Sequence, residues 1–66
     1  MKLKIGDLVL VDASAIGDGI AHTGVVEDIT TFLHTTFVYI HFHDLSPLGI
    51  NGVTLTNLEL IKKVPL

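Results

Sequence analysis

The sequence contains no cysteine and no arginine. Without cysteine the chain cannot form disulfides, and thiolate zinc sites, iron–sulfur clusters and thiol catalysis are excluded. Without arginine it lacks the side chain that most often reads guanine edges and holds phosphates through paired hydrogen bonds. Any function must therefore be built from other residue types.

Charge is also sparse. The four basic residues are all lysines, and against seven acids they leave a formal net charge of −3 at pH 7. Such a chain neutralises few phosphates, so we expect no nucleic-acid partner and no binding to anionic membranes. The lysines form pairs near the two chain ends, Lys2/Lys4 and Lys62/Lys63, which is typical of edge-strand charges that keep a small protein soluble.

Targeting signals are weak. No apolar run approaches the length of a membrane span. A short apolar stretch follows the first two lysines, but Asp7 and Asp12 interrupt it, so we expect no secretion signal. The expected location is the cytoplasm.

Residues 1–66 are expected to form one domain with a thin core, because a chain of this size buries only about 60% of its surface on folding. Apolar residues nevertheless make up 48% of the sequence. Several apolar side chains would remain in water unless a partner covers them. We therefore expect association with a partner protein or with a second copy of the chain.

Strand-forming residues dominate the composition. Val, Ile, Thr, Phe and Tyr account for 25 positions, whereas Ala, Glu, Gln and Arg account for only 5. β-branched and aromatic side chains suit a pleated, half-buried surface. The sequence predicts an all-β fold with strands at Asp7–Val11, Gly24–Thr30, Thr36–His43, Val53–Thr56 and Leu60–Val64.

The connections carry turn residues. In the long loop after the first strand, Asp12 and Asp18 are expected to form Asx turns. Asn51-Gly52 predicts a type I′ hairpin that joins Leu48–Ile50 to the fourth strand. A 3-10 turn around Asn57–Glu59 is expected before the last strand, and a short C-terminal helix is the alternative.

The third predicted strand has two different faces, because side chains alternate along a strand. One face is uniformly apolar and is expected to face the core: Val38, Ile40 and Phe42. The other face is aromatic and histidine-rich. It is expected to point outward and to form the partner-binding site: Phe37, Tyr39, His41 and His43.

The segment Ile5–Val11, with its Gly-Asp entry, and the segment Gly24–Ile29, with its Gly-x-Val entry, resemble the opening of KOW-type and other SH3-like domains. The segment Leu55–Ile61 is similar to the strand–3-10–strand ending of such domains. This resemblance implies a five-stranded SH3-like barrel and, for a KOW-type module, association with nucleic acid or ribonucleoprotein. RNA-binding KOW modules usually carry basic loops, whereas the first loop here carries Asp12 and Asp18.

His41 and His43 are the residues with metal-ligand spacing, because strand residues two apart project from one face. His34 or His22 would have to supply a third nitrogen. Without placed partners, we interpret the pair as surface histidines and expect no metal and no cofactor. Neither serine lies in a nucleophile elbow, and so small a domain offers little concave volume, so no enzymatic activity is expected.

The function favoured by the sequence is a non-catalytic protein-interaction module that acts through an outer sheet face. Two alternatives stay open at this point. One is a KOW-type nucleic-acid module, and the other is a small metal-binding protein built on histidines.

Overall fold

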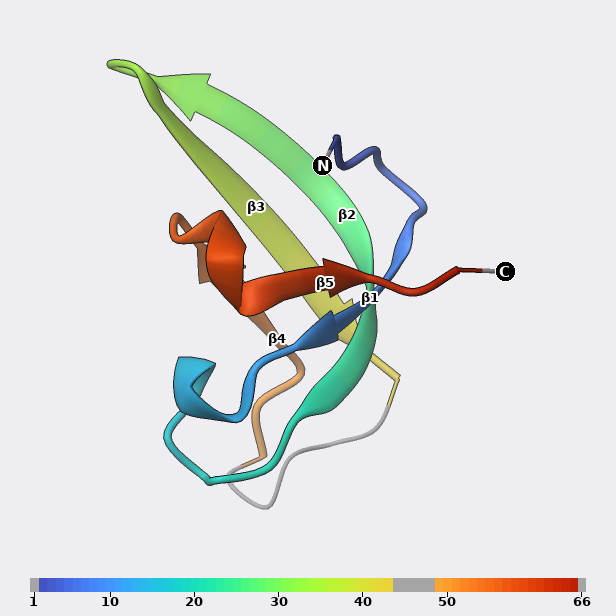
Figure 1. The fold of residues 1–66 in the computed structure, drawn as a ribbon. Coiled ribbons are helices and arrows are strands. Elements are labelled where there is room, and N and C mark those ends of the chain that lie inside the picture. The colour runs from blue at the N-terminus through green and yellow to red at the C-terminus, as the bar shows by residue number, and fades with distance from the viewer. Residues whose placement is uncertain (1, 44–48, 66) are drawn as a thin grey trace.

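The computed structural model describes residues 2–43 and 49–65. Within these residues the chain forms five strands and two 3-10 turns (Figure 1). In chain order they are β1 (Leu8–Val11), η1 (Ala13–Ala15), β2 (His22–Phe32), β3 (Thr35–Phe42), β4 (Gly52–Leu55), η2 (Leu58–Leu60) and β5 (Ile61–Lys63). The helical segments of the described residues have three residues each, which is far short of a transmembrane helix.

All five strands belong to one antiparallel sheet with the order β4-β3-β2-β1-β5. The all-β prediction is therefore confirmed. The expected closure into a barrel is wrong, since β4 and β5 are the two edges and no pairing of described residues joins them. The edge strands have only four and three residues, whereas β2 has eleven and β3 has eight. The free end of the β2–β3 hairpin consequently extends beyond the other strands (Figure 1).

The predicted strands agree with the observed ones to within a few residues. The largest difference is in β2, which is predicted as Gly24–Thr30 and extends further at both ends. The sequence pattern underestimates this strand because Thr31 and Phe32 are exposed, so no buried neighbour marks them as strand residues. Their extended conformation follows instead from pairing with β3.

The core is built from alternate residues of these strands. Val38, Ile40 and Phe42 are at most 3% exposed, which confirms the predicted core face of β3. Burying a side chain of this kind contributes about 1.5–3 kcal/mol to folding. The buried apolar side chains of the described residues are Val9, Val11, Val26, Val38, Ile40, Phe42, Leu55 and Ile61.

The tight hairpin of the sheet lies at Leu33–His34, between β2 and β3. Phe32 pairs with Thr35, which leaves a two-residue loop. Leu33 has a φ of 50° and His34 has a φ of 65°. Positive φ at both central residues is the geometry of a type I′ turn, which normally selects Asn or Gly. This turn therefore carries backbone strain that its own residues do not relieve.

The hairpin predicted at Asn51-Gly52 is wrong for the described residues. Gly52 is the first residue of β4 and lacks the positive φ that a type I′ turn requires. Of the strand predicted before the turn, Gly49 and Ile50 lie outside any strand, and Leu48 lies outside the described residues. A Cβ atom at Gly52 would lie 2.5 Å from the carbonyl oxygen of Ile40. Glycine is required here because two strands approach closely, not because a turn needs it.

Local side-chain bonds organise the loops as the sequence predicts. The carboxylate of Asp12 accepts the Ser14 N–H at 3.0 Å, and that of Asp18 accepts the Ile20 N–H at 3.0 Å, so both Asx turns are confirmed. The 3-10 turn before β5 is confirmed as well, and the side chain of Asn57 caps it. The alternative of a C-terminal helix is wrong.

Candidate functional site

The outward row of β3 occupies the face opposite the core. Phe37 is 36% exposed, Tyr39 is half-buried and His41 is exposed. His43 follows the last residue of β3 and is also exposed, with its N–H bonded to the carbonyl oxygen of Thr23 at 3.1 Å. The structure thus places the predicted site residues together along one strand and its immediate continuation.

Neighbouring strands extend this surface with residues that the sequence reasoning missed. Leu8 of β1 pairs with Val25 of β2, and Val25 pairs with His41 of β3. Residues in register share a face of the sheet, so an apolar row runs beside the histidine. Leu10 lies on the same face, and it, Leu8 and Val25 are half-buried. We call the combined surface the outer face: Leu8, Leu10, Val25, Phe37, Tyr39 and His41.

The signal for the missed residues was present in the alternation of the first strand. Val9 and Val11 are completely buried, so Leu8 and Leu10 must point to the opposite side. The sequence cannot show that this side continues the face that carries Tyr39. That continuity depends on the register between three strands that are distant in sequence.

Tyr39 lies across the edge strand and does not stand free in solvent. A Cβ atom at Gly52 would lie 2.6 Å from the Tyr39 hydroxyl oxygen and 2.9 Å from ring carbon Cζ. The phenol ring therefore covers the glycine, an arrangement that stabilises glycine in edge strands. Tyr39 as a whole stays half-buried, as expected for an amphipathic contact residue.

A second exposed apolar group lies at the tip of the β2–β3 hairpin. Leu33 is 81% exposed and Phe32 is 58% exposed. Both residues lie between the second and third predicted strands, Gly24–Thr30 and Thr36–His43, where the sequence analysis predicts no turn. Nothing in the residue types signals a tight turn at Leu33–His34, because neither residue favours a positive φ.

Asp18 of the first loop and His22, the first residue of β2, form a buried pair. His22 Nε2 lies 2.8 Å from Asp18 Oδ2, and the two side chains are only 3% and 4% exposed. The imidazole also packs against the ring of Phe42, with centroids 5.1 Å apart. The pair fixes the loop against the core, and its burial closes it to substrates.

The hydrogen bond from His22 and then that from the Ile20 N–H hold the pKa of the Asp18 carboxyl below its ordinary value. A lowered carboxyl pKa stabilises the folded state above the ordinary pKa, and that stabilisation disappears as the pH falls through the lowered pKa. We therefore expect Asp18→Asn to reduce the free energy of unfolding at pH 7 and to weaken its acid dependence below about pH 4. Urea unfolding between pH 7 and pH 3 measures both effects.

Asp28→Asn, an exposed position on β2, is the matched control for the loss of one carboxylate and is expected to cost less stability at pH 7 than Asp18→Asn. If the stability of Asp18→Asn decreased in parallel with that of the wild type at low pH, the stabilising role of the ionised Asp18 would be wrong.

The structure does not bring the four histidines together. His22 is buried on the core side, whereas His41 is on the outer face. His34 lies in the hairpin turn, seven positions from His41, which is roughly 23 Å along an extended strand. The described residues contain no group of three or more histidine, aspartate or glutamate side chains arranged to hold a metal ion. The proposed third ligand for His41 and His43 is therefore not supplied by His22 or His34.

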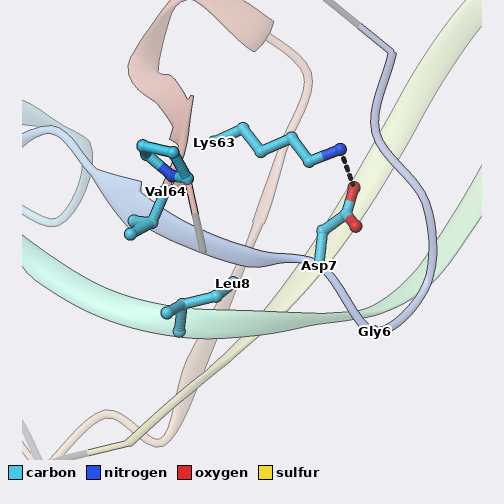
Figure 2. Close-up of a pocket in the computed structure, with 6 residues that line it drawn as sticks. Gly6, Asp7, Leu8, Lys63 and Val64 are labelled. Atoms are coloured by element: carbon cyan, nitrogen blue, oxygen red, sulfur yellow. Dashed lines mark ion pairs between the residues drawn. The ribbon is translucent and has the colours of Figure 1, made fainter.

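A groove of about 530 Å³ lies where β1 and β5 meet (Figure 2). Its walls are Gly6, Asp7, Leu8, Lys63, Val64 and Pro65. Lys63 Nζ and Asp7 Oδ2 point toward one another at 3.6 Å, and the Asp7 carboxylate also accepts the Lys4 N–H at 2.8 Å. Because these charges offset one another, the groove offers no net charge that would select a charged ligand.

Comparison with protein-family models, with curated proteins and with solved structures finds no match to this chain.

Proposed function

We propose that this chain is a non-catalytic protein-interaction module that binds a partner protein through the outer face of its sheet. The observation that carries the proposal is the continuity of apolar and aromatic side chains over β1, β2 and β3 on the side opposite the core. Aromatic residues beside aliphatic ones are typical of protein interfaces. Tyr39 and His41 are the proposed centre.

Two charged residues lie beside the apolar side chains of the outer face. Lys62 pairs with Leu10 at one side, and Asp28 pairs directly with Tyr39. Apolar contacts with charged residues beside them are usual in a non-obligate interface. The preferred partner surface would be mainly uncharged, with an apolar patch to cover Tyr39 and the two β1 leucines.

Two observations support a non-catalytic role. The hydroxyl of Ser14 donates to the carboxylate of Asp12, two residues earlier, and so takes part in a local turn. The Asp18–His22 pair has the composition of a catalytic dyad but is buried from solvent. The Ser14–Asp12 hydrogen bond and the Asp18–His22 pair therefore each have a structural role, which explains their short distances without a catalytic one.

We further propose that the sheet is an open relative of the SH3-like fold. The strand order β4-β3-β2-β1-β5 and the 3-10 turn before β5 support this relationship. The cytoplasm remains the proposed compartment, because a chain without cysteine has no requirement for an oxidising environment.

Tyr39→Ala is expected to abolish partner binding and to leave the sheet folded, because the lost ring covers the outer face and not the core. The purified chain and the variant are compared as baits in affinity capture from the native cell, followed by titration of the captured partner. A loss of about tenfold or more in affinity is expected for a central aromatic contact.

Leu58→Ala is the matched control, since Leu58 is a large apolar side chain that is 38% exposed and lies on η2, outside the three strands that form the outer face. It is expected to bind the partner as the wild type does. Equal capture by the wild type and Tyr39→Ala, with circular dichroism showing both folded, would refute the proposed site.

The KOW-type alternative predicts binding to RNA or DNA, whereas the charge of the chain predicts the opposite. A chain of net charge −3 without arginine is expected to show negligible affinity for RNA and duplex DNA near 50 mM salt, because few counterions are released on binding. Filter binding tests this directly. Submicromolar binding that weakens as salt is added would favour the nucleic-acid module over the protein-interaction module.

A further inference from the structure

The distal half of β2 has an open edge. β1 pairs with β2 only as far as Val25, and the last main-chain bonds on that side join Gly6 and Asp7 to Val26. A bulge follows between Val26 and Asp28. Beyond it, no described residue pairs with this side of β2, although the strand continues to Phe32.

The main-chain groups on that edge can be identified from the hairpin. In a two-residue turn the flanking residues Phe32 and Thr35 face each other and exchange hydrogen bonds. Main-chain groups alternate in direction along an antiparallel strand, so those of Thr31 and Ile29 point away from β3. Both residues therefore present N–H and C=O groups at the open edge.

This edge has little of the usual protection against pairing beyond its first residue, Asp28, and the bulge before it. Natural edge strands are blocked by charged side chains, by proline or by bulges. From Ile29 to His43 the sequence contains no Asp, Glu, Lys, Arg or Pro. The hairpin is instead rich in threonine, which suits strand pairing, and it ends in the exposed Phe32 and Leu33.

We propose that two copies of this chain pair through the open edges of β2, antiparallel and about a two-fold axis at Thr30. In this register Ile29 of one copy faces Thr31 of the other, and the edge groups identified above bond to each other. Thr30 meets Thr30 of the second copy on the outer side, a favourable β-branched cross-strand contact. The two sheets then continue as one.

A second copy is the occupant that the charges favour. Each chain carries a net charge of −3, so two copies repel wherever their acids meet. Past Asp28 the distal hairpin carries no Asp, Glu or Lys, so two copies can bring it together without placing like charges directly opposite each other. The edge is also self-complementary, because a strand paired antiparallel with itself satisfies the symmetry of an isologous dimer.

A two-stranded ribbon on its own is only marginally stable, and at its free end the β2–β3 hairpin has just two strands (Figure 1). Pairing with a second hairpin would give that region four strands. The strained Leu33–His34 turn and the exposed Phe32 would then lie beside the second copy, with Phe32 facing its Asp28 and diagonal to its Thr30.

This inference rests on the main-chain edge of β2 and the proposed function on the adjoining outer face, where Thr30 pairs with Phe37, and the variants below let the two fail separately. The test places charges on the two-fold axis. Thr30→Lys and Thr30→Asp each bring like charges face to face in a homodimer, and we expect each to weaken self-association by roughly fivefold or more. An equimolar mixture of the two variants places opposite charges on the axis and is expected to restore the dimer. Sedimentation velocity over a dilution series measures all three samples.

Thr54→Lys makes the same substitution on β4, at the opposite edge of the sheet, and is expected to dimerise as the wild type does. A wild-type monomer at every concentration, or dimers that persist in both Thr30 variants, would overturn the inference. Loss of the dimer in Tyr39→Ala with both Thr30 variants intact would also overturn it, and would assign self-association to the outer face.

Discussion

Replacing Ile40 by alanine is expected to lower the free energy of unfolding by about 2–5 kcal/mol. Ile40 is completely buried at the centre of the core, between β2 and β4. The substitution removes apolar contacts and leaves a cavity that the paired strands cannot close by moving. In a domain of this size each lost kcal/mol lowers the Tm by about 4–8 °C, so thermal unfolding reports the change directly.

Ile40→Val is the graded control, with an expected loss of about 0.5–1.5 kcal/mol. Tyr39→Ala, one residue away on the other face, is expected to lose less stability than Ile40→Ala. If Tyr39→Ala unfolded the domain while Ile40→Ala left it unaffected, the two faces of β3 would be assigned the wrong way round. The proposed interaction surface would then be wrong as well.

The second large effect is expected for Gly24→Ala. An alanine Cβ would lie 2.5 Å from the main-chain oxygen of His41 and 2.8 Å from Cγ2 of Ile40. The first contact involves main chain, so it can be relieved only by moving β2 away from β3. We expect a loss at the upper end of about 1–3 kcal/mol, measured as a lower urea midpoint with an unchanged m-value.

Gly19→Ala separates this crowding from the general effect of replacing glycine. Gly19 has a φ of +75° and no neighbouring atom within 4 Å of an added Cβ. Its substitution is expected to cost about 1 kcal/mol through backbone strain alone. A Gly24→Ala variant that loses no more stability than Gly19→Ala would show that the strands tolerate the extra methyl group.

The candidate site was predictable in part. Alternation in the third strand was sufficient to place Phe37, Tyr39 and His41 opposite the core, because a period of two needs no knowledge of neighbouring strands. The contribution of Leu8 and Val25 was not predictable. Their position beside His41 follows from strand register, which brings together residues from three separate segments.

The turns show the same division. The Asx turns at Asp12 and Asp18 involve residues two apart, and their residue types were enough to predict them. Asn51-Gly52 has the residues of a hairpin, yet the structure uses Gly52 for a close approach to β3. Leu33–His34 has none of these residues but forms the type I′ turn, since the long pairing of β2 with β3 imposes positive φ on it.

The sequence by itself determined the all-β class, the positions of the strands, the core face of β3 and the local loop turns. Each of these depends on composition, on a period of two or on contacts between near neighbours in the chain. Only the tertiary structure decided that His22 is buried against Asp18 and that, among the described residues, the sheet stays open and β2 extends past β1 with an unpaired edge. These features depend on the relative lengths and register of strands far apart in sequence, where long-range packing outweighs local preference.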